Sequence, residues 1–118
     1  MSETPRIPGT LIELRRPILP LPELIPAIVR EELLAGTLAM PVFFTLRGRK
    51  LSRWELSTVP ATERDALARE LGRDSEGVAM LGGVLGHPQS WALNVESPRV
   101  TCTVLIVVRD GDVLSRRV

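Results

Sequence analysis

The last part of the chain, residues 89–118, constrains the fold most strongly. Apolar and polar side chains alternate over Gln89–Ser97, which is typical of a strand that buries one face. Val100–Val108 is apolar at nearly every position and predicts a central strand that is covered on both faces. Asp110-Gly111 is a strong two-residue hairpin signal before a last strand over 112–118. We therefore predict that three consecutive strands end the chain.

The N-terminal end is rich in proline. Six of the ten prolines occupy positions 5, 8, 17, 20, 22 and 26. Proline fixes φ and removes a backbone donor, so we expect little regular structure before Glu23, although Thr10–Arg15 could pair as a short edge strand. We divide the chain into a Pro-rich N-terminal extension, residues 1–21, and a single domain, residues 22–118.

Two elements are predicted at the start of this domain. Leu24–Leu34 carries apolar residues at helical spacing, and Gly36 suits the C-terminal cap of that helix. Met40–Leu46 and Leu51–Val59 are rich in β-branched and aromatic residues on either side of Gly48-Arg49-Lys50. This pattern indicates a β-hairpin.

A second helical segment is predicted after Pro60. The Thr62 hydroxyl can cap a free amide, and Asp65 lies in the favourable first turn. Gly72 interrupts the segment, and helical spacing resumes over 78–85, either as one kinked helix or as a second short one. The residues that we expect on its contact face are Leu67, Leu71, Val78, Leu81, Gly82 and Leu85.

Gly82 and Gly86 lie one helical turn apart in this interpretation. They would remove side-chain bulk and let another backbone approach closely. A phosphate-binding loop is the alternative, but a Walker loop needs a lysine and a Ser/Thr, and a dinucleotide fingerprint needs a preceding strand. We therefore favour packing, against the sheet or a second subunit, over ligand binding.

Composition limits the function classes. The 118 residues carry a formal net charge of +1, so no global field attracts nucleic acid or an anionic membrane. Cys102 is the only cysteine, which excludes an intramolecular disulfide and fits a reducing compartment. We find neither a secretion signal nor a membrane-spanning stretch, and we expect a cytoplasmic protein.

The chain offers little that resembles a catalytic set. His87 is the only histidine, and Cys102 lies in an apolar strand where a thiol most often behaves as a small core residue. We predict no catalytic residue, no metal site and no cofactor. A small enzyme with a site between subunits around His87 is kept as an alternative.

A basic cluster marks the first hairpin. It consists of Arg47, Arg49, Lys50 and Arg53, with Trp54 beside it. Cations interleaved with exposed aromatic rings bind single-stranded nucleic acid, but hairpin tips are commonly charged because they are solvated. A solvated hairpin tip is therefore the favoured interpretation, and contact with an acidic protein partner or a nucleic acid through these four residues is the alternative.

Three segments stand out in this order of elements: Met40–Leu46 as first strand, Glu76–Gly86 as small-residue helix, and Thr103–Val108 as core strand. They resemble the Roadblock/LC7 family, in particular its MglB and MglC type proteins of bacterial motility and polarity control. The resemblance covers residues 24–118. It implies an α+β, profilin-like sandwich with a five-stranded, mainly antiparallel sheet and flanking helices, in which the family's C-terminal helix is missing.

The resemblance also implies a function. Such a protein would be a non-enzymatic adaptor or regulator that binds a Ras-like GTPase, a paralogous Roadblock protein, or both. It would form a homodimer in which central helices pack together and edge strands join the sheets. Val78, Leu81, Gly82 and Leu85 would then lie at the subunit interface.

Overall fold

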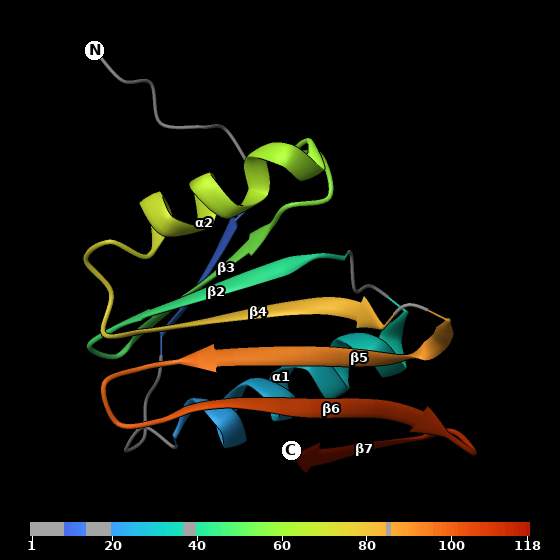
Figure 1. Cartoon of the computed structure of the whole chain (residues 1–118). Coiled ribbons are helices and arrows are strands. Elements are labelled where there is room, and N and C mark those ends of the chain that lie inside the picture. The colour runs from blue at the N-terminus through green and yellow to red at the C-terminus, as the bar shows by residue number, and fades with distance from the viewer. Residues whose placement is uncertain (1–8, 14–19, 37–39, 85) are drawn as a thin grey trace.

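The computed structural model describes residues 9–13, 20–36, 40–84 and 86–118. Its strands form one antiparallel sheet in the order β1-β3-β2-β4-β5-β6-β7, with helices on both faces (Figure 1). The elements are β1 (Gly9–Glu13), α1 (Leu21–Ala35), β2 (Val42–Arg47), β3 (Lys50–Glu55), a 3-10 turn (Ala61–Glu63), α2 (Arg64–Leu71), β4 (Gly77–Val84), β5 (His87–Glu96), β6 (Thr101–Arg109) and β7 (Asp112–Arg117). The α+β class is confirmed, but the prediction of five strands is wrong because the described residues form seven.

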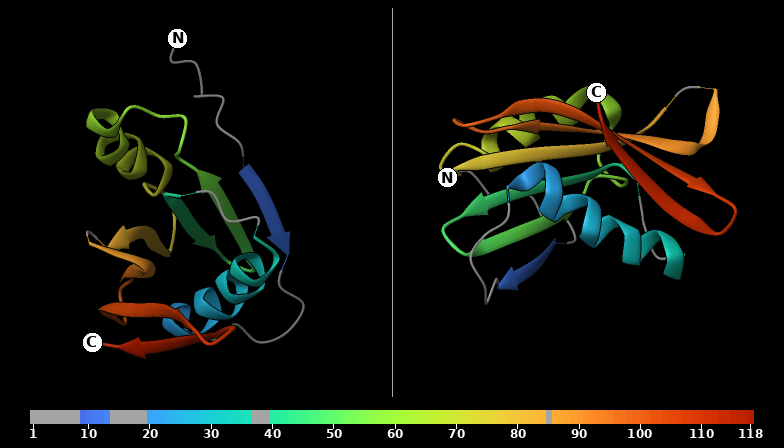
Figure 2. Two further views of the ribbon diagram at one scale, coloured as in Figure 1. Left: turned by 90° about the vertical axis from the view of Figure 1, so that its right-hand side faces the viewer. Right: turned by 90° about the horizontal axis from the view of Figure 1, so that it is seen from below.

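The sheet separates two apolar clusters. It curls around α1, which covers the concave face, while α2 lies on the opposite face near β2 and β3 (Figure 2). Neighbouring residues of β2 point to opposite faces: Phe44 packs in the α1 cluster with Ile25, and Phe43 packs in the α2 cluster with Leu67. This alternation lets one strand serve both cores.

The first helix follows the predicted pattern. Its buried stripe of Leu21, Ile25 and Val29 has a spacing of four residues, as expected of a helix that buries one face. Gly36 ends the helix in the left-handed region with φ of 70°, and its amide bonds to the carbonyl of Leu33. None of the described helices has the length and apolarity that crossing a membrane requires.

The prediction of a helix over 78–85 is wrong. Residues 77–84 form β4, which lies between β2 and β5 in the sheet. Ala79 and Leu81 point to the α1 side, whereas Val78 and Met80 join the α2 cluster. The apolar positions fit a period of two as well as a helical period, and strand pairing on both sides decides between them. Leu85 lies outside the described residues.

The entry to α2 also differs from the prediction. The chain passes through the 3-10 turn, Glu63 occupies the N-cap, and no side-chain hydrogen bond caps the helix there, so Thr62 has no capping role. Asp65 does lie in the first turn, and the helix ends before Gly72 as predicted.

The strands towards the two edges of the sheet were also predicted, β1 at one edge and β5 to β7 at the other. β1 pairs with β3, as predicted for a short edge strand, so part of the Pro-rich extension belongs to the domain; residues 14 and 15 lie outside the described residues. The C-terminal meander is confirmed, with Asp110 and Gly111 at positive φ in the last turn. The prediction that both faces of β6 are covered is wrong. Val104 is buried on the α1 side, but Leu105 on the other face is only half-buried, because it is not part of the α2 cluster.

Two glycines of β4 provide a test of this packing. A Cβ at Gly77 would lie 2.6 Å from Cδ1 of buried Leu21 and 3.3 Å from Cβ of Ser97, whereas a Cβ at Gly82 would meet no atom within 4 Å. We expect Gly77→Ala to lower the free energy of unfolding by about 1 to 3 kcal/mol through overpacking. Gly82→Ala, the matched control, should leave it unchanged or slightly raised. Urea denaturation measures both, and equal effects of the two variants would contradict the described packing.

Candidate functional site

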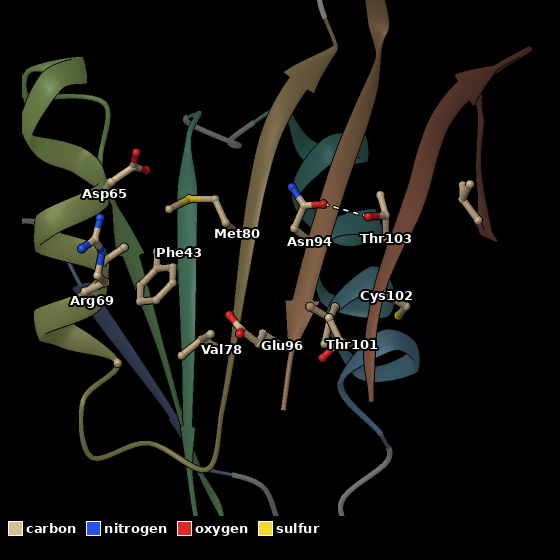
Figure 3. A pocket seen from close by; sticks show the side chains of 14 residues that line it. Phe43, Asp65, Arg69, Val78, Met80, Asn94, Glu96, Thr101, Cys102 and Thr103 are labelled. Carbon is tan, nitrogen blue, oxygen red and sulfur yellow. Dashed lines mark hydrogen bonds between the residues drawn. The ribbon is translucent and has the colours of Figure 1, made fainter. Parts of the chain in front are cut away.

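A groove of about 910 Å³ lies on the α2 side of the sheet (Figure 3). We call it the α2 groove. Its floor contains Phe43, Val78 and Met80, and Asp65 and Arg69 of α2 form one rim (Figure 3). On the other side the lining continues across Glu96 of β5 and Thr101 of β6 to Val118. The described strand residues that pack in the α2 cluster come from β2, β3 and β4, and the groove opens where the helix stops covering the sheet.

The pairing of the strands determines how the polarity of the groove floor changes from one strand to the next. Phe43, Met80, Asn94 and Thr103 lie side by side on β2, β4, β5 and β6. The floor is thus apolar beside α2 and polar towards β6, where the Thr103 hydroxyl donates to Oδ1 of Asn94 at 2.9 Å (Figure 3). Asn94 and Glu96 are exposed, so this side of the groove faces solvent.

This arrangement suits binding. An apolar floor can accept an apolar side chain, while the charged and amide groups at the rim can pair with polar groups of the same ligand. In the described part of the chain, no group of three or more His, Cys, Asp or Glu side chains is placed to hold a metal ion.

Arg53 is not part of the surface cluster that the sequence predicts. Its side chain is 7% exposed, and its Nε lies 2.8 Å from Oε1 of Glu32 on α1, while Nη1 lies 2.9 Å from Oε1 of Glu55. Burial lowers the pKa of Arg53, but the hydrogen bond to Glu55 and the charge and hydrogen bond of Glu32 outweigh it and raise the pKa above its usual value. Arg53 therefore stays charged and joins α1 to the sheet, and its assignment as a nucleic-acid contact is corrected.

The other three cations of the basic cluster remain at the surface. Arg47, Arg49 and Lys50 are exposed at the turn between β2 and β3. Trp54 is partly buried against the α2 cluster, and its indole N–H donates to the Thr45 hydroxyl at 3.2 Å. The indole is therefore engaged in the fold rather than offered beside the cations as a stacking platform.

The predicted interface residues do not form one surface. Leu67, Leu71 and Val78 belong to the α2 cluster, where α2 packs on the sheet. Leu81 is fully buried on the opposite face against α1, so it cannot contact a second subunit in this fold. Gly82 lies on β4 with open space where a Cβ would be.

The two remaining candidates from the sequence, His87 and Cys102, lie on β5 and β6. His87 is exposed at the start of β5, opposite Val84 where the register shifts. Cys102 packs half-buried against the α1 core, as expected of a small core residue.

Comparison of the chain with protein-family models, curated proteins and solved structures finds no significant match in any of the three. The α2 groove was not predicted from the sequence. Its sequence signal is the polar half of the β5 alternation, Asn94 and Glu96, which by itself predicts only a solvent-facing side of the strand.

Arg53 gives a second testable prediction. Arg53→Met removes the cation that Glu32 and Glu55 share, and we expect it to lower the free energy of unfolding by about 2 to 3 kcal/mol, less than for a fully buried pair because both glutamates are partly exposed. Arg49→Met, at an exposed position of the same hairpin, is the control and should have little effect. Chemical denaturation that finds both variants as stable as the original chain would show that the ion pairs do not hold α1 to the sheet.

Proposed function

We propose that this protein is a non-enzymatic adaptor or regulator that binds another protein through the α2 groove. The observation that carries the proposal is the groove itself: an apolar floor next to a helix, on a sheet face whose β5–β7 part no described helix covers. When a partner removes a surface of this kind from water, the free energy of the system falls.

The open side of the groove favours a macromolecular ligand. One side of the groove is open to solvent, where Asn94, Glu96 and Thr101 are exposed. A bound segment could therefore extend out of the groove on this side and continue into the rest of a larger partner. A segment of a protein partner can place apolar side chains over Phe43 and Met80 while its polar groups meet Arg69 and Glu96.

The class of partner rests on the family resemblance. We propose a Ras-like GTPase or a paralogous Roadblock-type chain, in a cytoplasmic system such as polarity or motility control. Helices on both faces of an antiparallel sheet are compatible with a profilin-like sandwich. The strand at Gly77–Val84 and the count of seven strands depart from that expectation, so the helix-mediated dimer that the resemblance implies has no counterpart among the described residues.

Affinity capture with a groove variant tests the proposal. Asn94→Arg places a bulky cation on the exposed side of the groove, and Gln89→Arg adds the same charge at an exposed position of the same strand outside the groove. We expect the original chain and Gln89→Arg to recover a Ras-like GTPase or a Roadblock-type protein from native lysate. Asn94→Arg should recover at least about tenfold less, a loss of about 1.4 kcal/mol in binding free energy.

Circular dichroism and thermal unfolding of both variants serve as the control for folding. If Asn94→Arg is folded and retains the same partner as the original chain, the α2 groove is not the binding surface. If capture recovers neither class of partner under conditions where the chain is folded, the proposed partner class is wrong.

A nucleic-acid-binding module remains the second candidate, because Arg47, Arg49 and Lys50 lie exposed on one turn. Under our proposal, titration with single-stranded RNA or DNA at physiological salt shows no specific binding. Binding that weakens steeply with salt and is lost when all three cations become glutamine would favour this second function instead. The triple variant of an exposed turn should remain folded.

A further inference from the structure

The exposed large apolar side chains of the described residues gather around one edge of the sheet. They are Leu34 at 55% exposure, Leu114 at 50% and Val118 at 71%. Leu114 lies on β7, Val118 follows it, and Leu34 belongs to α1, the helix that packs beside β7 (Figure 2). The edge at β7 therefore combines apolar side chains with a strand that has one neighbour, β6, among the described strands.

The hairpin fixes which backbone groups of β7 point outward. Arg109 and Asp112 flank a two-residue turn, so they form a hydrogen-bonded pair, and the pairs at Leu114 and Arg116 follow at every second residue. The amide of Val118 bonds to the carbonyl of Thr103 at 2.8 Å, in the same alternation. The backbone groups of Val113, Ser115 and Arg117 consequently face away from β6.

We propose that this edge pairs with β7 of a second copy of the chain, antiparallel and centred on Leu114. In that register, Val113 of each copy faces Ser115 of the other, which matches the outward backbone groups. Leu114 meets Leu114 of the second copy, and Asp112 of each copy lies opposite Arg116 of the other. The strand is thus self-complementary in charge, which is what a two-fold symmetric contact requires.

Asp112 has partners within the single chain that it would exchange. Its Oδ1 accepts a hydrogen bond from the Val113 amide at 2.8 Å and forms an ion pair with Arg30 at 3.1 Å. The side chains of Asp112 and Arg30 are both more than half exposed. An exposed ion pair contributes little stability, so its loss opposes the exchange only weakly. In the paired state the Ser115 carbonyl of the second copy takes the Val113 amide, and Asp112 turns to Arg116 of that copy.

The contact also continues an apolar surface. Leu114 lies beside Val107 of β6 on the face of the sheet opposite α1, and Val107 is half-buried. Leu34 lies one helical turn beyond Arg30, so it flanks the same edge from the α1 side. A contact made by one short strand and these side chains is small, so the dimer should be weak and should form reversibly with rising protein concentration.

Substitutions that reverse the charges of Asp112 and Arg116 test the register of the proposed pairing between the two β7 strands. In sedimentation equilibrium of the full chain, we expect self-association that Asp112→Arg and Arg116→Asp each weaken by about tenfold, because each places two pairs of like charges opposite one another. The double variant should restore it. A chain that stays monomeric at every concentration, or single variants that associate as the original chain does, would overturn the proposal.

Cross-linking provides the second measurement. In a Cys102→Ala background, Leu114→Cys should form a disulfide with its copy, whereas Ser115→Cys should not, because only Leu114 meets itself on the two-fold axis. A disulfide through Ser115→Cys and none through Leu114→Cys would contradict the register. Asn94→Arg should still self-associate, since Asn94 lies on β5 and β6 separates that strand from β7, so failure of this dimer is distinguishable from failure of the proposed function.

Discussion

The burial of α1 against the concave face of the sheet is the interaction on which the rest of the structure depends. Ile25 and Val29 are fully buried there, and each such side chain contributes roughly 1.5 to 3 kcal/mol when it leaves water. The ion pair between Arg53 of β3 and Glu32 of α1 fixes the position of the helix on the sheet at one point. With one face of the sheet occupied by α1, the other face is left to the much shorter α2, and the α2 groove is the consequence.

The division of the sheet into a covered and an uncovered part relates the fold to the proposed function. Phe43, Val78 and Met80 are shared between the α2 cluster and the groove floor, so the same residues hold α2 in place and contact a ligand. A partner bound in the groove would therefore touch the packing of α2 directly. The β7 edge adjoins the groove at Val118, whereas Leu114 and Ser115, at the centre of the proposed strand pairing, are not part of the groove lining.

Local patterns in the sequence predicted those elements whose residues interact mainly with near neighbours. The hairpin at β2 and β3, the meander from β5 to β7 and the glycine-ended helix α1 each carry their own turn or cap signal. β4 was predicted as a helix because its apolar residues fit two periods, and only its pairing with β2 and β5 selects the strand. Arg53 was assigned to the surface because its partner Glu32 is 21 positions away on another element. The groove depends on how far α2 extends over the sheet, which no local pattern specifies.

The most direct test of the central claim is amide hydrogen exchange of the chain with and without a captured protein partner. We expect added protection along α2 and the parts of β4, β5 and β6 that carry Met80, Asn94 and Thr103, with little change at the turn between β2 and β3. Protection confined to that turn, or to the α1 face of the molecule, would contradict the assignment of the α2 groove as the binding surface.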